Sequence, residues 1–128
     1  MLPGVEHSLD VLAYRDGTIA AVVPRTRLKV DSGIAVAGCS VPDPDLEAYG
    51  RAVATAIGLT SVANVQVKQD ASGAPSLLEV NPRFPGSMPL TVASGVNMPR
   101  LALDDALGRP VPASVPFRAL ATVRTWRD

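Results

Sequence analysis

The sequence predicts a single α+β domain, residues 1–128, built on an antiparallel sheet, and three observations carry this prediction. The chain has 128 residues, a length typical of one domain. Apolar residues make up 47% of it, which is enough to bury a sizeable core. Segments with strand-like alternation outnumber helical segments and follow one another through short turns, which favours antiparallel α+β over doubly wound α/β.

The first forty residues are expected to form strands. Leu9 and Val11 recur at the two-residue period of a pleated strand. Asp16-Gly17 is a dipeptide favoured in tight hairpin turns. The alternation then resumes and is expected to end at Pro24. After a break at residues 31–33, residues 34–41 are expected to form another short strand.

A basic stretch lies between these strands. Arg25, Arg27 and Lys29 occupy alternate positions, so all three side chains could point to one side of an extended segment. Charges placed in this way are typical of an edge strand protected from pairing with other chains.

The segment from Pro42 predicts a helix over residues 44–57. Asp43 is a candidate N-cap, and Pro44 suits the first helical position. Asp45 complements the positive end of the helix dipole. Apolar residues recur at helical spacing, and Gly58 is a natural C-terminal stop.

A hairpin and two helices complete the expected elements. Residues 61–68 and 76–81 read as strands around turn-forming residues 70–73. Helical spacing returns at 88–94 and 98–107. Residues 117–125 read as a last strand.

The hairpin is the most informative feature, because its two faces differ in character. Gln66 lies on the polar face of the first strand, and Glu79 and Asn81 share one face of the second. If the opposite apolar faces pack on the core, these three side chains converge, and their oxygens are the hard donors that Mg²⁺ prefers. A polar sheet face is usually only solvated, and the bare alternation favours that alternative. The apolar positions expected on the core are Ala63, Val65, Val67, Leu78 and Val80.

Composition excludes several classes of partner and site. Twelve basic residues balance twelve acidic ones, so there is no cationic surplus of the kind that binds nucleic acid or an anionic membrane. Cys39 is the only cysteine, which excludes an internal disulfide and a thiolate metal cluster. No segment reads as a signal peptide or a membrane span, so a cytoplasmic location is expected.

Motifs in the hairpin carry a resemblance to a known family. Asn64-Val-Gln66 is followed by Leu78-Glu-Val-Asn-Pro-Arg83 and then by Gly86. This pattern resembles the C-terminal lobe of the ATP-grasp family, and it looks closest to members similar to the large chain of carbamoyl phosphate synthase. The opening run from Glu6 and the segments 97–103 and 106–110 extend the resemblance over roughly residues 4 to 112.

The resemblance implies a fold, a site and a reaction class. The fold would be an antiparallel sheet with helices packed on one side. Glu79 and Asn81 match the family's Mg²⁺ (or Mn²⁺) ligands, Gln66 matches a third ligand position, and Arg83 matches the arginine facing the transferred phosphoryl group. The implied reaction is phosphorylation of a carboxylate substrate by ATP to an acyl phosphate, which an amine or other nucleophile then attacks.

The basic residues of the first half have a second possible role. In relatives, basic residues before a glycine-bearing loop line the phosphate or substrate path. Arg25, Arg27 and Lys29 could have this role, as an alternative of equal weight to edge protection.

The family's preceding lobe supplies a lysine, a glycine-rich loop and a hinge that reads the adenine, and we expect no counterpart of it before Met1. We therefore expect a chain that is inactive alone. The alternative is a non-catalytic assembly module, for example a homodimer, that keeps the fold.

Overall fold

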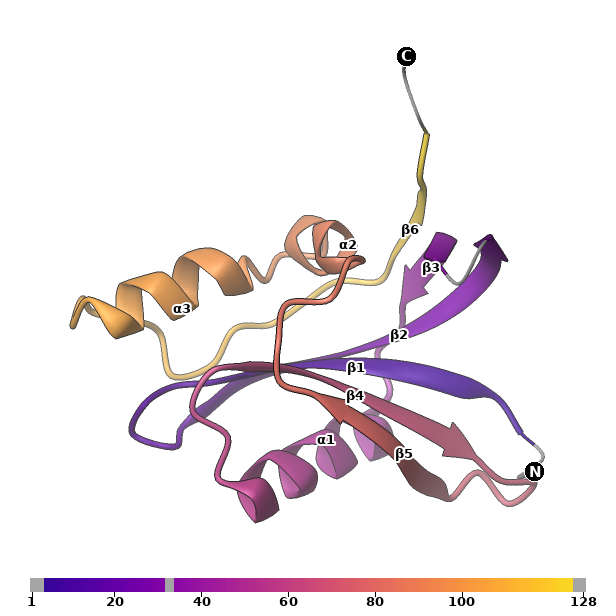
Figure 1. Ribbon diagram of the computed structural model, residues 1–128, viewed down its shortest axis with the longest axis horizontal. Helices are drawn as coiled ribbons and strands as arrows, with labels where there is room; N and C mark the ends of the chain where they lie inside the picture. Colours follow the sequence, from indigo (N-terminus) through magenta and orange to yellow (C-terminus); the bar gives the residue numbers. More distant parts are fainter. Residues whose placement is uncertain (1–3, 32–33, 126–128) are drawn as a thin grey trace.

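The computed structural model describes residues 4–31 and 34–125, with the backbone alone described for 27–31 and 34–36. Within these ranges the chain forms one six-stranded antiparallel sheet and three helices (Figure 1), which confirms the predicted α+β class. The strand order is β5-β4-β1-β2-β3-β6. The elements are β1 (Glu6–Ala13), β2 (Ile19–Asp31), β3 (Ile34–Ser40), α1 (Pro44–Ile57), β4 (Val62–Gln69), β5 (Pro75–Asn81), α2 (Met88–Ala93), α3 (Met98–Ala106) and β6 (Leu120–Val123).

Helices cover both faces of the sheet, and in this respect the structure differs from the expected packing on one side. Leu46 of α1 packs with Leu9 and Val65 on one face. Met88 of α2 and Met98 of α3 belong to a second buried cluster on the other face (Figure 1). The physical reason lies in β1, which is buried at every position after Glu6, so both of its faces need a covering layer.

Local sequence signals position α1 and the first turn as expected. The carboxylate of Asp43 accepts hydrogen bonds from the backbone N–H groups of Asp45 and Leu46, both at 3.1 Å. Gly58 ends the helix in the left-handed region, at φ 65°, which costs glycine little. The turn at Asp16-Gly17 closes through a 2.8 Å bond from the backbone N–H of Tyr14 to the carbonyl of Thr18.

The prediction that Pro24 ends its strand is wrong, because β2 runs through it to Asp31. Pro24 pairs with Leu9 on one side, and on the other its carbonyl accepts a 2.8 Å bond from the N–H of Val41. The β3 ladder begins only at Ser40, opposite Arg25. The missing N–H of Pro24 therefore lies just past Ser40, the last residue of β3, so no ladder bond is lost.

The last strand is shorter than the predicted 117–125, since β6 covers only Leu120–Val123. Its pairing with β3 stops where Leu120 lies opposite Ser40, the last residue of that strand. Within the part of the chain that the structure describes, none of the helices has the length and apolar character needed to cross a membrane.

Candidate functional site

The register between β4 and β5 brings the predicted ligand residues together. Gln66 lies directly opposite Glu79, and Asn64 lies directly opposite Asn81. Opposed residues of an antiparallel pair share a face with their Cβ atoms about 5 Å apart, and residues two apart on one strand share that face as well. The four side chains therefore belong to one polar patch, on the face that α2 and α3 also cover.

A β-bulge interrupts the hairpin just beyond this patch. The register shifts between Gln66 and Val67, so that Val67 pairs with Leu77 and Leu78 has no partner on β4. Val80 packs against the α1-side core as expected, whereas Leu78 is 45% exposed and does not. The extra residue of a bulge re-aims the side chains beside it, and alternation alone does not reveal where it falls.

None of the three predicted metal ligands is fully buried. Glu79 is exposed, while Gln66 and Asn81 are partly buried. Across residues 4–31 and 34–125, none of these three side chains forms a hydrogen bond or ion pair with the protein. One carboxylate and two amide oxygens are hard donors that suit Mg²⁺, which keeps water or phosphate at its other positions. The donor set therefore fits the predicted ion.

The same chemistry limits how tightly the hairpin alone can hold an ion. Among the described residues, no group of three or more His, Cys, Asp or Glu side chains is arranged to hold a metal. Glu79 is the one carboxylate of the predicted set, so phosphate oxygens from a nucleotide would have to supply much of the negative charge.

Arg83 lies two residues beyond β5 in an exposed turn. The turn is closed by a 2.8 Å bond from its backbone N–H to the carbonyl of Asn81. One guanidinium nitrogen donates to the carbonyl of Phe84 at 3.4 Å. A guanidinium carries five N–H donors, so Arg83 keeps most of its donors for an anionic ligand.

The basic stretch on β2 divides into a described and an undescribed part. Arg25 is 5% exposed, and its guanidinium forms a two-point ion pair with Asp10, at 3.0 Å to Oδ2 and 2.8 Å to Oδ1. Much of its charge is therefore compensated inside the protein. The side chains of Arg27 and Lys29 lie outside the described residues.

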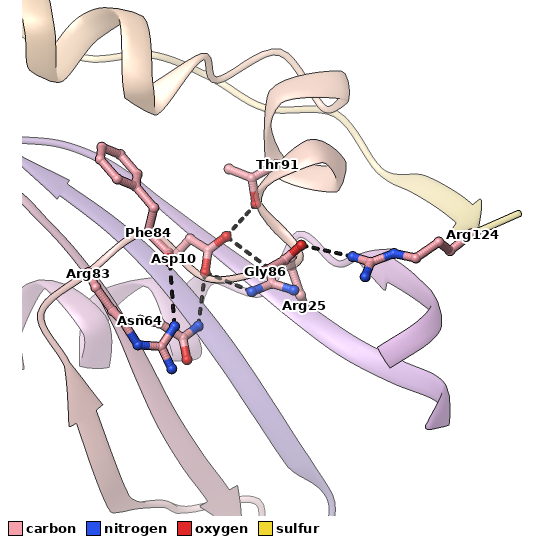
Figure 2. A network of polar contacts seen from close by, with 8 residues as sticks. All are labelled: Asp10, Arg25, Asn64, Arg83, Phe84, Gly86, Thr91 and Arg124. Carbon is pink, nitrogen blue, oxygen red and sulfur yellow. Dashed lines mark hydrogen bonds and ion pairs between the residues drawn. The ribbon is translucent and has the colours of Figure 1, made fainter. Parts of the chain in front are cut away.

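Asp10 is the centre of a polar network that the sequence analysis did not single out (Figure 2). Besides Arg25, its carboxylate accepts hydrogen bonds from Asn64 Nδ2 at 2.9 Å and from Thr91 Oγ1 at 2.5 Å. Asp10 and Thr91 are fully buried. The signal for this network was an acidic residue inside the apolar run of β1, because a buried carboxylate requires partners.

A cleft of about 340 Å³ opens beside this network. Its lining includes Arg25, Ser87, Leu90 and Arg124. Arg124 donates a 2.8 Å bond to the carbonyl of Gly86, and Figure 2 shows it reaching this loop from beyond β6. No sequence motif marked Arg124, because its position depends on the long-range pairing of β6 with β3.

Two remaining residues near the start of β1 have structural partners. The Nε2 atom of His7 lies 2.9 Å from Oε1 of Gln69, and the ring is buried. Glu6 lies 4.0 Å from the Lys68 ammonium, a distance at which an exposed ion pair contributes little stability.

The chain thus combines an antiparallel sheet with an oxygen-rich hairpin that is followed by an arginine. The profile of a family described as ATP-grasp in the biosynthetic pathway with Ter operon matches residues 1–128. The chain therefore belongs to the ATP-grasp family, as its motifs predict. No curated protein sequence matches the chain significantly.

Solved structures share the fold at low sequence identity. N5-carboxyaminoimidazole ribonucleotide synthetase from Thermus thermophilus is 21% identical, with TM-score 0.69, over 96% of this chain and 36% of that one. The phosphoribosylaminoimidazole carboxylase ATPase subunit from Aquifex aeolicus is 16% identical, with TM-score 0.70, over 90% and 37%. The biotin carboxylase domain of Hydrogenobacter thermophilus 2-oxoglutarate carboxylase, solved with MgADP and bicarbonate, is 18% identical, with TM-score 0.72, over 88% and 27%. The chain thus spans about a third of the length of these structures.

Proposed function

We propose that this chain is the Mg²⁺- and phosphate-contacting lobe of an ATP-grasp ligase that phosphorylates a carboxylate substrate. The observation that carries the proposal is the hairpin register, which sets Gln66 opposite Glu79 and beside Asn81 on one face. These oxygens have no partner among the described residues, which supports a role in binding a ligand. Exposed polar groups arranged in this way cost nothing to keep in water and are ready to bind.

The divalent ion would be held by Gln66, Glu79 and Asn81, and when bound it would neutralise and align phosphate oxygens. Arg83 would contact the phosphoryl group through guanidinium donors that the protein leaves largely unused. Arg25 would act indirectly, because its guanidinium is held by Asp10. Arg27 and Lys29 remain proposed phosphate contacts on the strength of the sequence alone.

The reaction proposed is formation of an acyl phosphate followed by attack of an amine or another nucleophile. The structures that share the fold include an N5-carboxyaminoimidazole ribonucleotide synthetase and a biotin carboxylase domain, and the latter holds MgADP and bicarbonate. Kinship with carbamoyl phosphate synthase is proposed from the motif. We further propose that activity requires the preceding ATP-grasp lobe, and that the protein works in the cytoplasm.

A second candidate function is assembly without catalysis. Its supporting observation is a group of large apolar side chains at the surface, each 45–57% exposed. They are Leu77, Leu78 and Phe84 around the hairpin, Leu103 on α3 and Leu107 at the C-terminal cap of α3. Exposed apolar side chains favour association with another copy or another lobe. Light scattering across a range of concentrations separates the two, because an assembly module dimerises without any response to Mg²⁺ and nucleotide.

Calorimetric titration with ADP, with and without Mg²⁺, tests the proposed function. The chain should bind ADP in a Mg²⁺-dependent manner, and Glu79→Ala should weaken this binding at least tenfold, about 1.4 kcal/mol. Asp45→Asn on α1, which covers the opposite face, is the matched control and should bind like the parent. Equal binding by the Glu79→Ala variant would contradict the assigned metal ligand.

A further inference from the structure

Asp10 has a saturated carboxylate. Its Oδ1 accepts from Arg25 and Asn64, and its Oδ2 accepts from Arg25 and Thr91. These four bonds use the four lone-pair directions of a carboxylate. The four residues come from β1, β2, β4 and α2, so one buried side chain ties together four elements, among them β4, which carries Gln66 of the proposed site (Figure 2).

The bond from Asn64 fixes which way its amide faces. A carboxylate paired with Arg25 can only accept hydrogen bonds, so the amide nitrogen of Asn64 must face Asp10. The amide oxygen then lies on the other side of the group, as Figure 2 shows. Asn64 is opposite Asn81 and two residues from Gln66, so its side chain lies next to the polar patch.

We propose that Asp10 is a positioning residue for the divalent-cation site, and that it acts by orienting Asn64 so that the amide oxygen faces the hydrated cation. The proposal rests on the proposed function, because it takes the Gln66, Glu79 and Asn81 patch as the cation site. It adds Asn64 as a fourth oxygen acceptor and gives the buried ion pair a role beyond holding the sheet. Asn64 is 4% exposed, so its oxygen can serve only a ligand seated directly against the hairpin.

The structure explains why Asp10→Asn should disturb this orientation selectively. The new amide keeps the shape of the carboxylate but replaces one acceptor oxygen with a donor NH₂ group. In place of Oδ2 that donor would face Arg25 Nε and the Thr91 hydroxyl, and in place of Oδ1 it would face Arg25 Nη2 and Asn64 Nδ2. In the second orientation the conflict with Asn64 is relieved if its amide turns over, which would direct the amide nitrogen of Asn64 at the cation.

Manganese, used as a spectroscopic substitute for magnesium, provides the test on the full chain. Electron paramagnetic resonance titration gives the Mn²⁺ affinity with and without ADP, and ¹⁵N NMR follows the side-chain amide of Asn64. We expect Asp10→Asn to weaken Mn²⁺ binding at least fivefold and to remove the hydrogen-exchange protection of the Asn64 amide. Asn64→Ala should weaken Mn²⁺ binding similarly, and it keeps the test available if Asp10→Asn does not fold.

Ser94→Ala is the matched structural control. Ser94 is the buried C-terminal cap of α2 and donates to Ser40 at 2.8 Å, so it also ties α2 to the sheet but forms no hydrogen bond with Asp10. This variant should lose stability while keeping Mn²⁺ affinity within twofold of the parent. Parental affinity in a folded Asp10→Asn or Asn64→Ala chain would overturn the positioning role alone. Absence of Mn²⁺ binding by the parent, with or without ADP, would remove the cation site and the proposal with it.

Discussion

The two polar regions of this molecule lie on neighbouring strands of one sheet face, yet they are built in opposite ways. The network around Asp10 is buried, and each carboxylate oxygen has two donors within 3.0 Å. The hairpin patch of Gln66, Glu79 and Asn81 is partly or fully exposed and has no protein partner within the described ranges. Asn64 belongs to both regions, since it donates to Asp10 and lies opposite Asn81.

The difference separates polar side chains that hold the fold together from polar side chains that are available to a ligand. A buried charge must be satisfied by the protein itself, so the Asp10 network resists change and holds its surroundings in place. An exposed donor set with no protein partner costs little stability and stays available to a ligand. Substitutions in the two regions should therefore have opposite signatures, with a large effect on stability in one and a large effect on binding in the other.

The largest expected effect on stability comes from Asp10→Ala. It leaves the Arg25 guanidinium buried without its counter-charge, and such losses cost about 3–5 kcal/mol. Glu79→Ala should change the free energy of unfolding by no more than about 0.5 kcal/mol, as is usual for exposed positions. Urea denaturation of both variants measures the contrast. A similar loss in the two would show that the hairpin patch is part of the structural framework.

Thr91→Val should produce an intermediate effect. It replaces the hydroxyl that donates to Asp10 with a methyl group of similar size, and a hydrogen bond to a charged group contributes about 1.5–3 kcal/mol. Thr91→Ser keeps the hydroxyl and removes only a methyl group, so it should lose about 1 kcal/mol. The same urea series tests this order. A larger loss in the serine variant would mean that α2 is held by packing alone.

The smallest expected effect lies on α3, where an exposed ion cluster resembles neither region. Hydrogen bonds from Arg109 and then Arg100 lower the pKa of Asp104 below its ordinary 3.8. Because the pKa of Asp104 is lowered in the folded state, these contacts stabilise the protein at pH values above the ordinary carboxyl pKa. The stabilisation is lost as the pH falls through the folded-state pKa. Asp104→Asn should therefore reduce stability slightly at pH 7 and not at all once the parental carboxyl is protonated. A difference between the two proteins that persists at that acidic pH would point to packing instead of charge.

Short-range chemistry made much of this structure predictable. The residues of α1 follow from its cap, its proline and its final glycine, and the convergence of Gln66 with Glu79 follows from alternation in a hairpin. Other features depend on partners distant in sequence. Strand β2 crosses Pro24 because β3 ends beside it, and the bulge at Leu78 depends on the β4 register.

The Asp10 network shows the same limit within the site. Its members are separated by up to 81 residues, and no local pattern pairs Asp10 with Thr91. The sequence showed the acidic residue in an apolar strand but not the residues that pair with it. The buried partners that explain it emerge only when four elements are packed together.

Paramagnetic broadening by Mn²⁺ in the ¹⁵N spectrum of this chain would locate the bound ion. In the presence of ADP, we expect broadening to be strongest at Gln66, Glu79, Asn81 and the side-chain amide of Asn64, and Glu79→Ala to abolish it. Broadening centred on the acidic residues Asp104 and Asp105 of α3, or no localised broadening at all, would contradict the claim that the hairpin is the cation site.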